Sequence, residues 1–398
     1  MALDDLGRLK LTPSAPGLVE LRVTAVDADG FQAIETQSLR VRDPLDLSAP
    51  RLAWAAELRG AEAEAAPIAI RAATRLRAEI EERQLMGWQL EIAPLRNGAP
   101  AGAWVTLAEA NGGGNAVAGT LDLAQLDPAP LANGPYQLRL RAWDLSGRSQ
   151  EISAAVLVDS RDKRLNQALV SDGLFQLGAH RVALSRSLAE QAGGPEDLGN
   201  WRLPLLETHL RTDQTAISPL GAPQAWQEGA TVWLEIPSDL SRPEAPLASL
   251  RFSLSTREEA LGAGAAAPIT LRPRFSADQG WSLEALEADG DQPVGLKRQG
   301  QRLYDQTSGL AWIPQRWALT GPDGSRYSLD GNGTLESIRF SDGQQWLVSD
   351  AGLVPVGASD PAERLEFVRD PQGRIVRISG PAVPTGTGEA QPVALAYR

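Results

Sequence analysis

Two stretches of the sequence, GLVELRVTAVDADG at residues 17–30 and GPYQLRLRAWDLSG at residues 134–147, match each other position by position. Every matched position in the second stretch lies 117 residues after its counterpart in the first, as Gly30 and Gly147 do. Apolar residues fall on alternate positions in both stretches, and this period of two places their side chains on one face of a strand. The repeated unit is therefore predicted to be a β-strand that ends in a tight turn.

The turn after each of these strands opens with an acidic residue, Asp27 in the first copy and Asp144 in the second. Asp bonds its own nearby backbone in such turns, and the following Gly accepts a positive φ. A second strand is expected at residues 38–41 and 155–158, and both end 11 residues after the turn Gly. A hairpin repeated at about the length of an immunoglobulin-like domain, roughly 100 residues, predicts tandem β-sandwiches.

The chain before residue 161 divides on this basis into two parts and a linker. Residues 51–160 are expected to form an Ig-like β-sandwich, and residues 1–43 the C-terminal part of another, because too few residues precede the first hairpin. Intrinsic propensity favours a helix at Ala61–Met86, but we expect strands there because a lone helix does not suit a sandwich. The glycines of Asn111–Asn115 predict a plain loop.

The rest of the chain predicts short strands between turns. Residues 161–300 are expected to form a β-rich spacer and residues 301–398 the start of an array of hairpins. Strand-like pieces of the spacer lie at residues 174–177, 182–184, 231–236, 250–254 and 269–271. Turn glycines of the array follow one another at steps of 9, 10, 9 and 21 residues: Gly324, Gly333, Gly343, Gly352 and Gly373. Strands this short are stable only when stacked, which is typical of repeat architectures.

Residues 365–378, LEFVRDPQGRIVRI, resemble an RHS/YD repeat of the rearrangement-hotspot and teneurin type. In that repeat a strand ends in Asp-x-x-Gly-Arg, here Asp370, Gly373 and Arg374, and an apolar-x-x-apolar strand follows. The segment at 317–353 is similar to the lead-in of such arrays, and 198–203 resembles the step before it. The Tyr-Asp pair that names the repeat is absent from a repeat position.

The resemblance implies the front portion of a longer, non-catalytic chain that contributes to a β shell. Such a shell encloses or presents a C-terminal effector, so the implied partners are downstream RHS repeats and that effector. The implied location is secreted or at the cell surface. An adhesion or carbohydrate/protein-binding module, with a cell-surface protein or a glycan as partner, remains the alternative.

Composition narrows the function further. The 398 residues carry a net charge of −12, which opposes binding to nucleic acid. The sequence has no Cys and two His, which excludes disulfides and a Cys nucleophile and leaves little room for His-based chemistry. No apolar run approaches the roughly 18–20 residues of a membrane helix. The first five residues show neither the basic nor the apolar region of a signal peptide.

Several residue patterns contain side chains that could form a site. The carboxylates of 27–30 and of 330–334 suit Ca²⁺ in type, but each is better explained as an ordinary hairpin turn. Ser185 and His180 lie on one predicted strand and make a poor nucleophile pair. Adjacent acids such as Glu81 and Glu82, or 258–259, point to opposite strand faces and are expected to be solvated.

No catalytic, cofactor-binding or metal-binding residue is therefore expected. Most of the 11 Trp residues are expected in the core, although an exposed one would suit a sugar ring. The residues predicted to matter are structural turn residues, and they are Asp27, Gly30, Asp144, Gly147, Gly324, Gly333, Gly343, Gly352, Asp370, Gly373 and Arg374.

Overall fold

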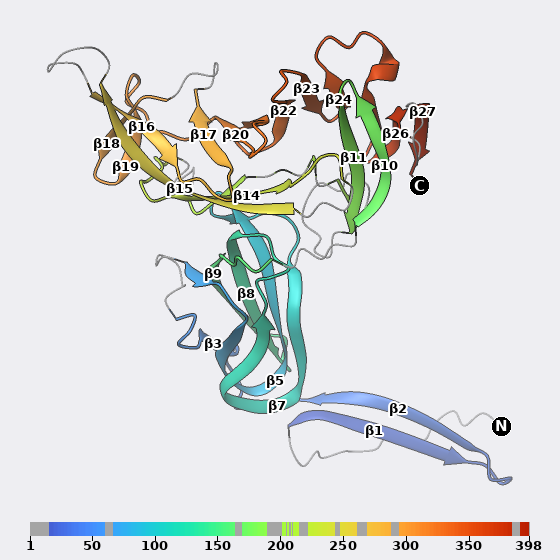
Figure 1. Ribbon diagram of the computed structural model, residues 1–398. Helices are drawn as coiled ribbons and strands as arrows, with labels where there is room; N and C mark the ends of the chain where they lie inside the picture. Colours follow the sequence, from blue (N-terminus) through green and yellow to red (C-terminus); the bar gives the residue numbers. More distant parts are fainter. Residues whose placement is uncertain are drawn as a thin grey trace.

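The computed structural model of the chain describes residues 16–59, 67–163, 169–188, 201–203, 205–206, 208, 210–214, 222–242, 247–260, 269–287, 294–383 and 391–397. Apart from one 3-10 turn at Pro361–Glu363, the regular elements in these residues are β-strands. The predicted all-β class is thus confirmed. Figure 1 shows three parts: a long N-terminal hairpin, a sandwich, and an upper body of two sheets.

The N-terminal hairpin consists of β1 (Gly17–Val26) and β2 (Gln32–Val41), which form a two-stranded antiparallel sheet. It projects sideways from the foot of the sandwich (Figure 1). Most of its side chains are exposed on both faces. The structure thus holds the predicted hairpin, and whether it belongs to a larger sandwich stays a prediction.

The sandwich contains β3 (Arg51–Trp54), β4 (Ile68–Ile70), β5 (Thr74–Arg96), β6 (Ala99–Pro100), β7 (Val105–Leu126), β8 (Gly134–Asp144) and β9 (Ser149–Val158). The first half of β5 pairs with β3 and the end of β7, and its second half pairs with β8 and the start of β7. The two halves thus act as strands B and C of an immunoglobulin-like fold, while β7 supplies E and the β8–β9 hairpin supplies F and G. The strands form one continuous seven-stranded sheet that folds over a single apolar core.

A tyrosine corner supports this assignment. The Tyr136 hydroxyl, near the start of β8, donates a 3.0 Å hydrogen bond to the Ala132 carbonyl four residues upstream. The same device marks strand F in immunoglobulin-like domains. Its presence here agrees with the predicted Ig-like sandwich at residues 51–160.

The predicted loop at Asn111–Asn115 is wrong, because these residues lie inside β7. Asn111 pairs with Gly87 and Asn115 with Leu85 in the middle of β5, and the ladder register shifts between them. A Cβ on Gly112 would lie 2.3 Å from the Leu85 carbonyl oxygen, so only Gly fits at this corner. The preference for strands over a helix is confirmed for the described part of 61–86, at β4 and β5.

The upper body contains two sheets. The six-stranded sheet has the order β13 (Leu210–Thr212), β14 (Thr231–Pro237), β15 (Leu247–Ala260), β16 (Ile269–Phe275), β18 (Leu296–Gln299) and β19 (Arg302–Asp305). The second sheet has twelve strands, and its central stretch is a meander of hairpins in sequence order. That meander runs through β20 (Arg316–Thr320), β21 (Arg326–Asp330), β22 (Leu335–Arg339), β23 (Gln345–Ser349), β24 (Gly352–Pro355), β25 (Leu365–Arg369) and β26 (Ile375–Ala382).

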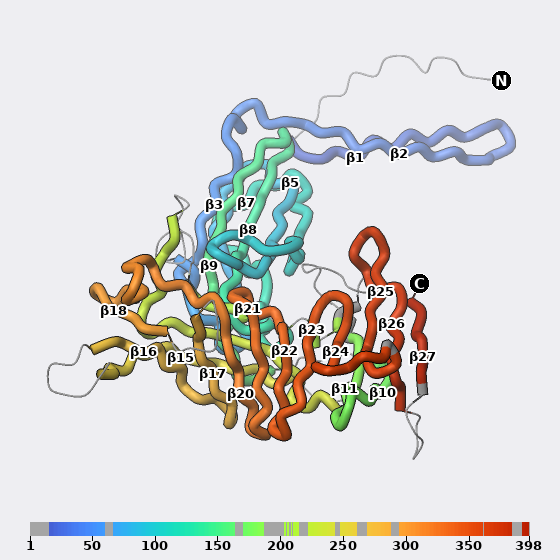
Figure 2. Tube along the Cα trace, turned by 90° about the horizontal axis from the view of Figure 1, so that it is seen from above, coloured from blue at the N-terminus to red at the C-terminus, as the bar shows by residue number. Residues whose placement is uncertain are grey.

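Strands distant in sequence close both ends of the meander. β17 (Ser282–Leu286) pairs with β20. At the other end, β10 (Leu169–Leu177) bridges to β26, with β11 (His180–Leu188) and β12 (Trp201–Arg202) beyond it, and β27 (Gln391–Ala396) also pairs with β26. Figure 2 shows β10 and β11 beside the C-terminal strands. All the strands predicted in the spacer and the array are present at the predicted places.

The predicted division between residues 300 and 301 is not a boundary of the fold. It falls inside the β18–β19 hairpin, whose strands pair from Leu296–Asp305 to Gln299–Arg302. One hydrophobic core also extends from Phe175 to Ile378. The spacer and the array therefore fold as one body, because the short array strands need the spacer sheet to cover their apolar face.

The predicted turn glycines take positive φ values between 81° and 136°. In the turns that end at Gly30, Gly147, Gly333 and Gly373, the Gly N–H donates to the carbonyl of the Asp three residues earlier. Gly352 differs because it begins β24 and follows the turn instead of closing it. The Asp-x-x-Gly pattern thus specifies one local turn that recurs along the chain.

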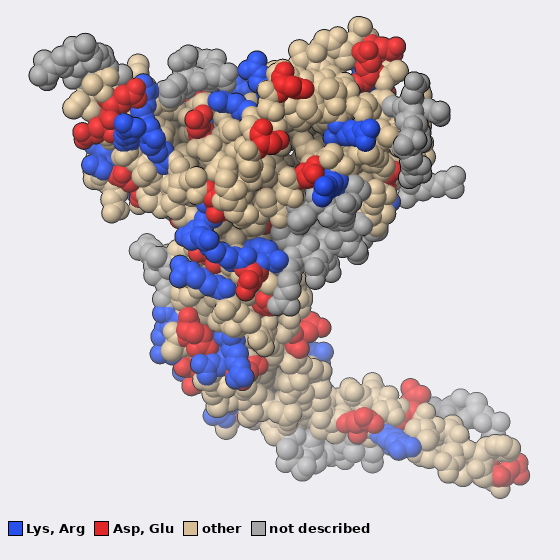
Figure 3. All heavy atoms as spheres, viewed as in Figure 1, with Lys and Arg blue, Asp and Glu red and all other residues tan. Residues whose placement is uncertain are grey.

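A contact region, here called the neck, joins the sandwich to the upper body. It consists of Asn133, Asp159, Ser160, Lys163, Arg211, Trp233 and Arg251. The Trp233 indole N–H donates to the Asp159 carboxylate over 3.3 Å, and Arg251 Nε lies 3.5 Å from the same oxygen. Basic side chains gather around this region in Figure 3.

Candidate acidic site at the foot of the sandwich

Two of the predicted turns, those of Asp27 and Asp144, have the same backbone hydrogen bonds. Each Asp accepts from the Gly three residues on and donates its own N–H to the carbonyl four residues on. Asp27 Oδ1 also accepts the backbone N–H groups of Asp29 and Phe31 and is exposed. Residues 27–30 thus form the hairpin turn that was predicted, and Asp330, which bonds its own turn in the same way, shows the same for 330–334.

The turn at Asp144 continues into an Asp-x-x-Gly-Arg motif, as the turn at Asp370 does. Arg148 Nε donates to Asp144 Oδ2 over 2.6 Å, and Arg374 Nε donates to Asp370 Oδ2 over 2.8 Å. The Asp144 and Arg148 side chains are 0% and 29% exposed, whereas those of Asp370 and Arg374 are 14% and 55% exposed. The same five-residue motif thus forms an ion pair in both places, and the pair in the sandwich is the more buried of the two.

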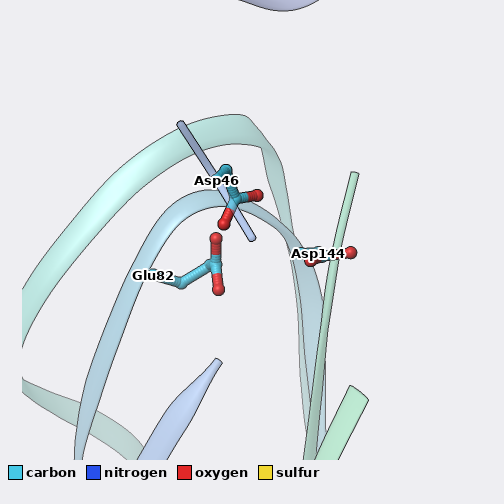
Figure 4. Close-up of side chains that lie close together, drawn as sticks. All are labelled: Asp46, Glu82 and Asp144. Carbon is cyan, nitrogen blue, oxygen red and sulfur yellow. The ribbon is translucent and has the colours of Figure 1, made fainter. Parts of the chain in front are cut away.

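The buried copy gathers further charges, and Figure 4 shows three carboxylates facing one another. Asp46 comes from the linker, Glu82 from the bend of β5 and Asp144 from the end of β8, and one oxygen of each lies within 4.8 Å of the others. All three residues are buried. Arg148 Nη2 lies 2.8 Å from Asp46 Oδ2, so one guanidinium bridges two of the acids. We call these four residues the acidic junction.

The acidic junction holds more negative than positive charge. Burial raises the pKa of the Glu82 carboxyl, and the nearby charges of Asp46 and Asp144 raise it further, although the Gln84 backbone N–H, which donates to Glu82 Oε1, opposes this rise. Burial alone would lower the pKa of the Arg148 guanidinium, but the hydrogen bond to Asp144 and the charges of Asp144, Asp46 and Glu82 together raise it. The Glu82 carboxyl is therefore easier to protonate than a solvated one.

Three clustered carboxylates suit a hard cation in type, since Ca²⁺ takes six to eight oxygen ligands. Here the guanidinium of Arg148 already supplies positive charge to Asp46 and Asp144. Next to the junction, Gln84 also binds the start of the linker, because its side chain accepts from the Asp43 N–H and donates to the Val41 carbonyl. The chemistry that the geometry supports is an ion-pair network that fastens the linker to the sandwich.

The prediction that Glu82 is solvated is wrong. Glu81 and Glu82 do point to opposite faces of β5, and Glu81 is exposed as expected, but the linker covers Glu82. Asp46 and Arg148 were not identified from the sequence. The available signal was the Asp-x-x-Gly-Arg motif at Asp144, which matches the motif of the array.

His180 and Ser185 both lie on β11, as predicted. The His180 ring stacks on Phe340 with 3.7 Å between the ring centroids, and its Nε2 lies 2.9 Å from Asp342 Oδ2. Ser185 borders a cavity of about 20 Å³ between β11 and Leu240, which has room for about one water molecule. These contacts give His180 the structural role that was expected, tying β11 to the turn after β22.

Most described Trp side chains are in the core, as predicted; the buried ones are Trp54, Trp88, Trp226, Trp233, Trp281, Trp312, Trp317 and Trp346. Trp104 is partly exposed, and the guanidinium of Arg139 lies 4.0 Å from its ring centroid. A cation already covers this ring, so it is a poor platform for a sugar.

No protein-family model matches the sequence, and no curated protein matches it. Among solved structures, the protocadherin GammaB4 extracellular domain is similar at 13% identity and a TM-score of 0.15, over 79% of this chain and 53% of that chain. The chain thus spans about half the length of that protein. Among the described residues, no helix has the length and apolar character that crossing a membrane requires.

Proposed function

We propose that the chain is a non-catalytic scaffold, in which the sandwich is a stalk and the upper body begins a β shell of the RHS/YD type. In this proposal the shell encloses or presents a C-terminal effector, and the protein works outside the cell or on its surface. The observation that carries the proposal is the meander from β20 to β26, in which each strand pairs with the next in sequence.

The meander has one buried face and one strand edge to which further strands could be added. Its strands bury alternate residues against the shared core, as Trp346 and Val348 do in β23, while Leu347 between them is exposed. β27 pairs with β26 on one side and, among the described strands, with nothing on the other. An open edge of this kind is a template for the next hairpin of an array.

The test is to express the chain past Arg398 along its own coding sequence and to compare β27 in the longer and the 398-residue chains by hydrogen exchange and limited proteolysis. The proposal expects slower exchange at β27 and protease resistance in the longer chain. The Leu347→Asp variant, on the exposed face of β23, is the control for non-specific effects. A stop codon after Arg398, or a β27 that stays equally labile, would refute the shell.

A further inference from the structure

The N-terminal hairpin and the β8–β9 hairpin of the sandwich are the same unit in three dimensions. Val19 pairs with Leu39 in the first, and Tyr136 pairs with Val156 in the second, so both strands keep the offset of 117 residues. The shift holds along the whole ladder, from Gly17–Val41 and Gly134–Val158 to the turns. The sequence repeat therefore preserves not only strands but also register.

The two hairpins differ in what covers them. Residues at alternate positions of β1 share one face, and in β8 the matching face is completely buried: Leu138, Leu140 and Ala142 are 0% exposed. Val23, which matches Leu140, is 42% exposed, and Leu21, which matches Leu138, is only partly buried. An apolar face that the fold buries in one copy is thus open in the other.

The second copy shows what such a hairpin binds. The outer edge of β8 pairs with the second half of β5, where Leu90 and Ile92 lie opposite Leu140 and Leu138. Strand β3 and the first half of β5 cover the other side of the same core. The outer edge of β1 has no ladder partner in the described chain. A lone two-stranded hairpin is marginally stable in water, and a free apolar edge favours pairing.

We propose that the apolar face of β1–β2, with the free edge of β1, is a docking surface for a β-strand segment outside residues 17–398. That segment supplies the remaining strands of a second immunoglobulin-like sandwich. Its edge strand runs antiparallel to β1 and places apolar residues opposite Leu21 and Val23, as β5 does for β8. Gln37 occupies the position that the buried Ala154 has in the second copy. Docking would bury the Gln37 amide, so the segment supplies a hydrogen-bonding group for it.

The chain itself provides a probe for this surface. Residues 51–133 are the strands that cover β8–β9, and fusing a second copy of them directly before Gly17 reproduces the natural junction of Asn133 with Gly134. Hydrogen exchange at the outward-facing amides of β1 is expected to slow by about 100-fold in the fusion. Val23→Asp, on the docking face, is expected to abolish the protection, and its neighbour Thr24→Asp, on the opposite face, to preserve it.

A second measurement covers a fusion that does not fold. A labelled peptide of residues 85–96, the strand that borders β8, is titrated into the intact chain and followed by fluorescence anisotropy. Binding that Val23→Asp weakens at least tenfold and Thr24→Asp does not supports the proposal. Failure of both the fusion and the peptide to engage β1 overturns it. So does sedimentation showing a dimer that Val23→Asp dissociates, because the occupant is then a second copy of the chain.

Discussion

The sandwich is fastened at both ends by buried ion pairs, but the two ends have opposite charge balance. At its foot, the acidic junction places Asp46, Glu82 and Asp144 around the single guanidinium of Arg148. At the neck, the carboxylate of Asp159 faces several cations and the Trp233 indole. One residue carries the minority charge in each joint, Arg148 at the foot and Asp159 at the neck, and each joint is expected to depend on that residue.

The two joints should respond to pH in opposite directions. Burial raises the pKa of Glu82, so the folded foot binds a proton more readily than the unfolded chain. Burial lowers the pKa of Lys163 at the neck from 10.5 to about 8, with Arg211 adding to the effect and Glu235 opposing it. Rising pH is therefore expected to reduce the contribution of the foot to folding stability and to increase that of the neck. The following variants test this contrast, from the largest expected effect to the smallest.

Asp144→Ala is expected to lower the free energy of unfolding of the sandwich by about 3 kcal/mol, because the buried Asp144 carboxylate accepts hydrogen bonds from both the backbone N–H and the Nε of Arg148. The measurement is urea unfolding followed by Trp fluorescence. Asp370→Ala, in the matching exposed turn, is the control and should change the unfolding midpoint much less. Equal shifts for the two variants would show that the turn, and not burial, determines the strength of the ion pair.

Asp159→Ala is expected to cost about 2 kcal/mol at the neck, because it leaves the buried Trp233 indole N–H without its acceptor. Unfolding of the sandwich and of the upper body should then separate into two transitions in calorimetry. The control is Asp162→Ala, a neighbouring exposed acid. If the two transitions of Asp159→Ala coincide as in the unmodified chain, the contact does not couple the two parts.

The sequence was sufficient for the turns and the strands because their determinants are local. Asp370 and Gly373 lie in one turn, and the carboxylate and the positive φ act within five residues. The period of two then predicted five strands of the meander, β21, β22, β23, β25 and β26, but not β20 or β24. The same local logic placed Glu81 and Glu82 on opposite faces of β5.

The acidic junction was not predictable because its members come from three separate elements. Glu82 meets Asp46 only because β5 bends at the Gly-rich corner and the linker returns across it. A pattern of alternation says that two residues face opposite ways, but not which of them a distant segment covers. The false boundary at residue 300 has a different origin, because it divides the local β18–β19 hairpin, whose turn contains Gly300.

Lys163→Met isolates the pH response of the neck. The Lys163 ammonium donates to the carbonyls of Pro128 and Leu131, and below about pH 8 it must remain charged in a partly buried position. As the pH rises from 8 to 10.5, the folded chain loses this proton before the unfolded chain does, so stability should rise by about 1 kcal/mol after allowance for solvent exposure. Urea midpoints at pH 7.5 and 9.5 should show this rise, and Lys163→Met should lack it. Lys297→Met, an exposed control, should retain it, and a loss of the rise there would assign it to other groups.

Glu82→Gln provides the smallest and most specific test of the foot. The amide oxygen can still accept from the Gln84 N–H, while the charge that repels Asp46 and Asp144 is removed. Because the raised pKa favours the folded state below about pH 4.5 and this advantage is lost as the pH rises, the gain from Gln should be about 0.5–1 kcal/mol at pH 7 and should vanish near pH 4. Glu81→Gln, one residue away on the exposed face, should change neither value. A Glu82→Gln chain less stable than the original at pH 7 would mean that the junction needs the negative charge, and the foot would then belong to the same class of joint as the neck.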